Sequence, residues 1–151
     1  MIYLIYLLIT LLTFIVMEGI TWCTHKYIMH GFGWYLHEDH HRPGYKHVFE
    51  KNDAFFLVFA TPSILLFGYG IIPELNYLFF IGFGILLYGL AYFLIHDVLI
   101  HRRFKWFDKV NNRYFRASRK AHKIHHKKMG KPDGQCFGML CFPYKYYKEA
   151  R

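Results

Sequence analysis

The chain has 151 residues, of which 54% are hydrophobic and 21% aromatic, and it carries a formal net charge of +9 with histidine neutral. This length fits one domain, over 1–151. The apolar residues are concentrated in long runs, which argues against a small soluble protein. In such a chain, positive charge favours a membrane surface over a nucleic acid as partner.

Three apolar runs are each long enough to cross a bilayer, because about 20 helical residues span the roughly 30 Å of hydrocarbon. The expected spans are about 2–22, 54–72 and 77–95. The first run lacks the positive N-terminal region and the small-residue cleavage site of a signal peptide. The predicted fold class is therefore an all-α integral membrane protein with about three to four transmembrane helices.

A few residues within these runs are unusual for a membrane helix. Glu18 either faces the bundle interior or lies near the interface, and the sequence leaves both open. Pro62 is tolerated where neighbours satisfy the freed carbonyl. Gly82, Gly84 and Gly89 predict close approach between helices.

The segments outside the spans are polar. Gly31–Gly33 predicts a break, followed by a short helix bearing the histidines at 37–41 and ending at Arg42–Gly44. Asn52-Asp53 is a candidate N-cap for the next apolar run. The stretch 136–142 is too short to span and predicts an interfacial or buried segment.

Ten of the eleven histidines fall in four clusters, here called the histidine boxes. Two boxes read H-x2-H-H, and on a helix offsets of three and four place three imidazoles within an arc of about 100°. Two read H-x4-H, and offset five separates side chains by about 140°. These need a π-bulge, or rings that flank different ions, or a helix that ends between them. In chain order the boxes are His25 and His30; His37, His40 and His41; His96 and His101; and His122, His125 and His126.

Neutral imidazole is a ligand for zinc, iron, copper and nickel. Ten imidazoles exceed the needs of one ion, whereas two ions with about five nitrogens each would use them all. Zinc binds such nitrogens more tightly than ferrous iron but cannot cycle electrons. A histidine-only dimetal centre at a membrane surface thus suits oxygen activation on a lipid-phase substrate. His47, outside the boxes, is expected to be an ordinary histidine.

Acidic residues near the boxes are expected to offset the charge of the ions. The candidates are Glu38, Asp39 and Asp97, and Asp97 lies one helical turn before His101, within reach of a ligand imidazole. Cys136 and Cys141 form a C-x4-C pair without a second pair, so free thiols are expected there rather than another metal site.

Charge predicts the orientation of the chain. Three passes place 24–53 and 96–151 on the same side of the membrane, and all 19 lysines and arginines lie in these two regions. The other side has the N-terminus and the turn at 73–76. The positive-inside rule therefore puts all four boxes, as a dimetal cap, on the cytosolic side.

The order of the boxes, H-x4-H, H-x2-H-H, H-x4-H, H-x2-H-H, is similar to that of the bacterial β-carotene hydroxylases, within the fatty acid hydroxylase and sterol desaturase superfamily. The resemblance extends to Met17-Glu18, His25–Gly31, Phe49–Asp53 and the segment 130–138. It covers nearly the whole chain, and the combination is specific, whereas a single H-x2-H-H would be weak.

This resemblance implies a non-haem di-iron monooxygenase of the bacterial cytoplasmic membrane, which hydroxylates C3 of the β-ionone rings and converts β-carotene to β-cryptoxanthin and zeaxanthin. It implies two Fe²⁺ ions and O2, with electrons from NAD(P)H through ferredoxin reductase and ferredoxin. It implies a carotenoid substrate in the bilayer, contact with membrane lipids and no nucleic acid. By match to the boxes, the iron ligands would be His25, His30, His37, His40, His41, His96, His101, His122, His125 and His126.

Two alternatives remain at this point. One is a fatty acyl or sterol hydroxylase or desaturase of the same superfamily. The other is a membrane metal transporter or storage protein, although transporters place their ligands near the bilayer midplane and the central parts of these spans contain no histidine. Preference between β-carotene and keto-ring carotenoids depends on the shape of the pocket.

Overall fold

The structure is a computed structural model that describes residues 1–42, 49–107, 109–127 and 134–150. Within these residues all regular structure is helical, with no strand. Three helical segments are long and apolar enough to cross a membrane: Ile2–Phe32, Lys51–Gly70 and Tyr77–Ile100. The expected all-α membrane fold with three spans is confirmed.

Two of the three spans continue beyond their α-helix as a π-helix. Helix α1 (Ile2–Cys23) runs into η1 (Thr24–Phe32), and α4 (Tyr77–Phe93) runs into η3 (Leu94–Ile100). The other elements are α2 (Trp34–His37), the 3-10 turn η2 (Lys51–Asp53), α3 (Ala54–Gly70), α5 (Arg113–Lys127) and α6 (Tyr144–Glu149).

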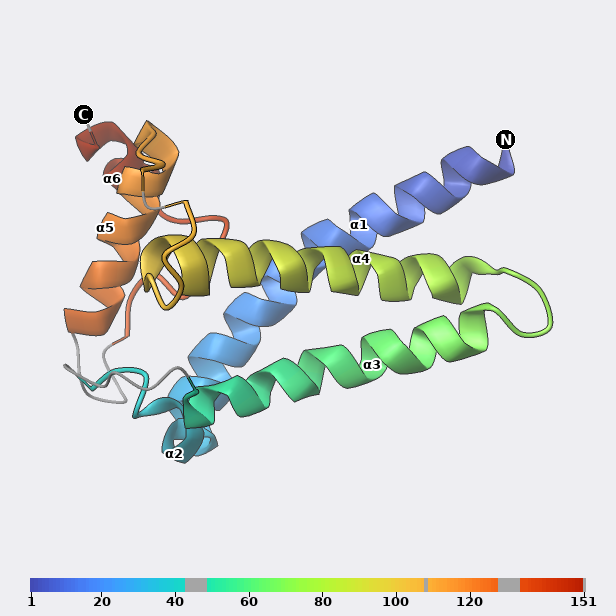
Figure 1. Ribbon diagram of the computed structural model, residues 1–151, viewed down its shortest axis with the longest axis horizontal. Helices are drawn as coiled ribbons and strands as arrows, with labels where there is room; N and C mark the ends of the chain where they lie inside the picture. Colours follow the sequence, from blue (N-terminus) through green and yellow to red (C-terminus); the bar gives the residue numbers. More distant parts are fainter. Residues whose placement is uncertain (43–48, 108, 128–133, 151) are drawn as a thin grey trace.

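Helices α3 and α4 form an antiparallel hairpin, and α1 packs against α4 (Figure 1). The N-terminus and the turn that joins α3 to α4 lie at one end of the three spans (Figure 1). The short helix α2, the end of α4 and the helix α5 gather at the opposite end (Figure 1). All four histidine boxes therefore lie at one end of the helical bundle.

Glycines allow α4 to approach its two neighbours closely. A Cβ atom built on Gly84 would lie 2.6 Å from Thr13 Cβ of α1, and one built on Gly82 would lie 3.0 Å from the carbonyl oxygen of Ser63 in α3. The prediction of close approach is right for these two positions. It is wrong for Gly89, where a Cβ would have no neighbour within 4 Å.

Other expectations for local structure hold in part. Pro62 lies inside α3, which ends at Gly70, two residues before the predicted end. Helix α2 ends at His37, so the predicted helix over 37–41 is wrong beyond that residue, and 38–41 form turns.

The expected N-cap of α3 is not formed by Asp53. Asp53 precedes α3 but makes no side-chain cap bond to it. Its carboxylate instead accepts a bond from the backbone N–H of Glu50 at 3.0 Å. Pro43, Gly44 and His47 lie outside the described residues.

The contact between α1 and α4 yields a test. Replacing Gly84 with valine should destabilise the protein by about 1–3 kcal/mol. The new side chain would overlap Thr13, and the helices would have to move apart to accommodate it. Gly68→Val on α3 is the matched control, since Gly68 is exposed and has open space at its Cβ. Thermal unfolding in detergent should show a lower Tm for Gly84→Val alone, and equal Tm values for the two variants would contradict the packing described here.

Candidate metal centre

The two H-x4-H boxes lie on the two π-helices. In η3 the backbone N–H of His101 donates to the carbonyl oxygen of His96 at 2.9 Å, and the N–H of Gly33, which follows η1, donates to Ile28 at 2.8 Å. Hydrogen bonds between residues five apart bring rings at offset five to the same side of the helix. Of the three arrangements left open by the spacing, the π-helical one is therefore found in both boxes.

Glycine permits the break that follows the first box. Gly31 has a non-helical backbone (φ −102°, ψ −126°). A Cβ on Gly33 would lie 2.9 Å from the carbonyl oxygen of Ile28 and 3.1 Å from the ring of Phe55. The predicted break at Gly31–Gly33 is confirmed, and it turns the chain so that α2 lies next to η1.

The two H-x2-H-H boxes have different local structures. His37 ends α2, and His40 and His41 follow it in a turn, so this box does not form the expected arc on one helix face. The last box does lie on a helix, α5, whose buried side carries Ala117, Ala121, His122 and His125. The side chain of Asn112 accepts a 2.9 Å bond from the N–H of Phe115 at the start of α5.

The box histidines come together in two adjacent groups. In each group every ring offers a nitrogen within 4.8 Å of the others. His96 lies beside the second group, with its Nε2 3.2 Å from Nε2 of His40. The first histidine group is His25, His30, His37, His41 and His125; the second is His40, His101, His122 and His126, with His96 next to it.

Each H-x2-H-H box contributes to both groups. His37 and His41 belong to the first group and His40 to the second, while α5 gives His125 to the first and both His122 and His126 to the second. The groups touch where the rings of His41 and His126 stack with centroids 4.4 Å apart. The sequence suggested two ions with about five nitrogens each, and the two groups have this size.

Oxygen atoms around the groups fix the tautomer of four rings. Nδ1 of His25 and Nδ1 of His125 lie 3.0 and 2.8 Å from the backbone carbonyl oxygens of Phe137 and Gln135. Nδ1 of His37 lies 2.7 Å from the side-chain oxygen of Asn52, and Nδ1 of His40 lies 2.7 Å from a carboxylate oxygen of Glu50. Since oxygen acceptors require a donor, each Nδ1 carries the proton and each Nε2 presents a lone pair to the interior.

These inward lone pairs face one another. Nε2 of His25 and Nε2 of His37 are 3.2 Å apart, and both lack a proton. Two acceptors at this distance cannot form a hydrogen bond and repel each other, so a cation between them is what satisfies both. Ligand nitrogens about 2.1 Å from one ion at right angles lie roughly 3 Å apart. The donor set therefore fits a metal ion.

Burial keeps the box histidines that lie outside the three spans neutral. Removal from water lowers the pKa of His125 to about 4, of His37 to about 3 and of His126 to about 2, all from an ordinary value of 6.5. Burial, with neighbouring histidines as a second cause, also lowers the pKa of His40, His41, His101 and His122. Every one of these rings is unprotonated at pH 7, as metal ligation requires.

The acidic residues singled out from the sequence have varied roles. Asp97 Oδ2 lies 3.4 Å from Nδ1 of its neighbour His96, rather than next to His101, and Asp97 Oδ1 is 2.5 Å from Arg103 Nη1. Glu38 pairs with Arg42 at the surface. Asp39 accepts bonds from the backbone N–H groups of residues 40 and 51.

Sequence reasoning missed Glu50 and Asn52 as partners of box histidines. Both belong to the stretch Phe49–Asp53, which the family resemblance had marked but for which no role was inferred. The side-chain oxygen of Asn52, the first half of the candidate N-cap, bonds His37, and α3 has no side-chain cap bond. The sequence signal for this role is an acidic residue and an amide that follow the second box and precede the second span.

Glu18 anchors the segment that orients two of the rings. Its Oε1 accepts bonds from the backbone N–H groups of residues 139, 140 and 141 at 2.9, 3.0 and 2.8 Å, and its Oε2 accepts one from the Tyr88 hydroxyl at 2.7 Å. Of the two placements left open, Glu18 therefore faces the protein interior. It holds the chain beside Phe137 and Gln135, whose carbonyl oxygens face His25 and His125.

The segment 136–142 packs against the metal centre without crossing the membrane. Phe137 and Met139 are buried, as expected for an interfacial or buried segment. Cys136 and Cys141 are free thiols, also as expected, and they belong to neither histidine group.

Comparison with known proteins identifies the family of this chain. The fatty acid hydroxylase family model matches residues 10–143. A β-carotene hydroxylase of Pseudescherichia vulneris is 44% identical over 88% of this chain and 74% of the relative, and one of Pantoea ananas is 43% identical over 90% and 77%. A third β-carotene hydroxylase, from a Paracoccus strain, is 37% identical over 90% of this chain and 83% of the relative.

No solved structure matches the chain significantly. The resemblance inferred from the order of the boxes is confirmed by the sequence relatives, which align over most of the chain. The family match includes all four boxes and the segment that Glu18 anchors. This chain belongs to the fatty acid hydroxylase family.

Proposed function

We propose that this protein is a β-carotene 3-hydroxylase, which inserts one oxygen atom at C3 of each β-ionone ring and yields β-cryptoxanthin and then zeaxanthin. Each step consumes a ring C–H bond, one O2, two electrons and two protons, and gives the ring C–OH and water. The observation that carries the proposal is the pair of histidine groups, buried or half-buried, with inward-facing Nε2 atoms, in a chain similar to proteins named for this activity.

Two iron ions are the proposed cofactors, with five box histidines for each. The first ion would be held by the first histidine group and the second by the second group together with His96. Iron would supply the one-electron chemistry that activates O2, which zinc cannot provide. Electrons from NAD(P)H are proposed to arrive through a ferredoxin reductase and a ferredoxin.

The chain itself would keep the ligands neutral, oriented and dry. Carbonyl oxygens, Asn52 and Glu50 hold the protons on the outer nitrogens, so the inner nitrogens stay free for the metal. Burial of the rings excludes water and disfavours their protonation. The carboxylate of Glu50, bonded to His40, would also offset part of the positive charge of the ions.

The membrane orientation follows from charge. We place the histidine end of the bundle on the cytosolic side of the cytoplasmic membrane, because all lysines and arginines of the sequence fall in the regions 24–53 and 96–151, which also contain the boxes. A carotenoid would reach the centre from the bilayer between the spans. The basic surface would attract an acidic electron donor and anionic lipid headgroups.

The alternatives explain fewer of these observations. A fatty acyl or sterol hydroxylase or desaturase would use a similar centre, but the relatives described above are named as β-carotene hydroxylases. A metal transporter would hold ions between the spans, whereas both histidine groups lie at one end of the bundle.

Loss of one ligand should abolish the activity. In a bacterial host that makes β-carotene, the wild-type chain should produce zeaxanthin, and His125→Ala should lower hydroxylated pigment by about 100-fold or more. Lys123→Ala is the control on the exposed side of the same helix and should behave as wild type. Pigments measured by chromatography decide the outcome. Unchanged carotenoids beside newly hydroxylated or desaturated fatty acids would contradict the proposal.

Acid should destabilise the metal-free protein. Because the folded-state pKa values of the buried histidines lie below the ordinary 6.5, the unfolded chain binds more protons as the pH falls below about 6.5. Stability should be independent of these groups above that pH and should decrease steadily below it, while bound metal is released by competing protons. The Tm of chelator-treated protein and the metal retained after dialysis, both from pH 8 to 5, check this. A Tm that rises on acidification would show that the rings are not buried in the neutral form.

A further inference from the structure

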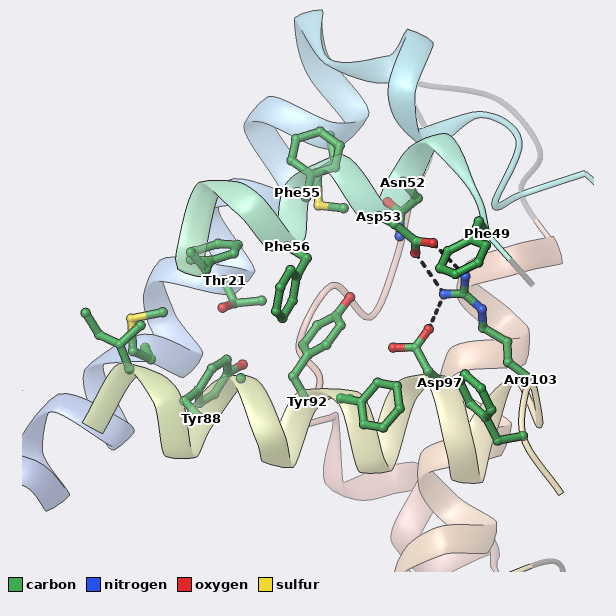
Figure 2. Close-up of a pocket in the computed structure, with 17 residues that line it drawn as sticks. Thr21, Phe49, Asn52, Asp53, Phe55, Phe56, Tyr88, Tyr92, Asp97 and Arg103 are labelled. Carbon is green, nitrogen blue, oxygen red and sulfur yellow. Dashed lines mark hydrogen bonds and ion pairs between the residues drawn. The ribbon is translucent and has the colours of Figure 1, made fainter. Parts of the chain in front are cut away.

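A cavity of about 320 Å³ lies between the three spans, next to the metal centre. It is lined by side chains of α1, α3 and α4, and most of its wall is apolar (Figure 2). Aromatic rings dominate the α3 wall, where Phe55, Phe56 and Phe59 line it. Such a cavity inside a membrane bundle favours an apolar ligand that arrives from the lipid phase.

One end of the cavity is polar, and two of the residues that line it also contact box histidines. Asn52, Asp53, Asp97 and Arg103 line this end, and Arg103 bonds both carboxylates (Figure 2). Asn52 bonds His37 of the first histidine group, and Asp97 lies 3.4 Å from His96 beside the second. A ligand in this cavity is therefore next to both halves of the centre, while the histidines themselves remain outside its wall.

Tyr92 brings a hydroxyl group to the cavity wall. Its side chain rises from α4 toward α3 (Figure 2), and its ring lies 4.8 Å from that of His96. Among the described residues the hydroxyl of Tyr92 makes no hydrogen bond, in contrast to that of Tyr88, which bonds Glu18. A hydroxyl on the cavity wall without a protein partner can bond a polar atom of a ligand, and that bond adds to the affinity of the ligand.

We propose that this cavity binds one six-membered ring end of the carotenoid, and that the Tyr92 hydroxyl bonds an oxygen atom carried by that ring. The inference rests on the proposed function and adds its binding site and a specificity residue. The cavity is at the lower end of the roughly 300–1,000 Å³ typical of small-molecule sites. It takes a ring end and leaves the long polyene outside, between the helices. Through the bond to Tyr92, the cavity also accepts rings that already carry a keto group.

Gly89 allows the cavity to be filled without disturbing the fold. It lines the cavity, and a Cβ built on it would have no neighbour within 4 Å. Alanine, valine and leucine at this position should lower β-carotene conversion progressively, by about tenfold or more for leucine, with metal content unchanged. They should also lower the β-carotene retained by purified, metal-free protein, measured by absorbance.

The same substitutions at Gly68 are the matched controls, because Gly68 has equally open space but lies on the exposed side of α3, away from the cavity. Conversion and retained pigment in the Gly68 series should match wild type. If the Gly89 series matches the Gly68 series, or if its losses follow losses of metal, the cavity does not bind the substrate. If the wild type itself converts no carotenoid, the proposed function fails, and the two failures are thus distinct.

The role of Tyr92 is tested with a competing pair of substrates, β-carotene and a carotenoid with a keto group on each ring. Removal of one hydrogen bond by Tyr92→Phe should lower conversion of the diketo substrate relative to β-carotene by about fivefold. Tyr69→Phe, at an exposed position of α3, is the control and should leave the ratio unchanged. An unchanged ratio in Tyr92→Phe would overturn the assignment of this hydroxyl.

Discussion

The structure brings together imidazole lone pairs whose mutual repulsion a cation would relieve. Four box histidines donate a hydrogen bond from the outer nitrogen, Nδ1, to an oxygen atom. Two of these bonds go to backbone carbonyls, one goes to Asn52 and one goes to Glu50. Their inner nitrogens must then meet as acceptors, as those of His25 and His37 do at 3.2 Å. Burial also keeps the rings outside the membrane spans from relieving this by taking up protons. The fold thus brings neutral nitrogen donors together in an arrangement that fits metal ions.

Distant parts of the chain cooperate to create this arrangement. The π-helical ends of α1 and α4 align the rings of each H-x4-H box, while α2 and α5 distribute their histidines between the two groups. Glu18 fixes the segment 139–141 through backbone hydrogen bonds and so positions the carbonyls that face His25 and His125. Because each H-x2-H-H box contributes to both groups, the two sites cannot form independently.

The sequence predicted the parts of this protein that depend on periodicity and composition. Run lengths predicted the spans, and the number of box histidines predicted two sets of about five rings, which matches the two groups in the structure. Spacing could not choose the π-helices, because hydrogen bonding in the folded backbone decides between α and π turns. It also failed for His40 and His41, which lie in a turn after Gly33 redirects the chain. The partners of the outer nitrogens were not predictable from the sequence, because two of them are backbone carbonyls. The carbonyl that faces His25 belongs to Phe137, 112 residues later in the chain, and the one that faces His125 belongs to Gln135, which follows α5.

The most direct test of this account is X-ray absorption at the iron edge of the purified protein. Two sites made of imidazoles predict about five nitrogen neighbours per iron, with the multiple-scattering pattern of histidine and no sulfur. A shell dominated by carboxylate oxygen or containing cysteine sulfur, or one with only one or two imidazoles per iron, would contradict the account.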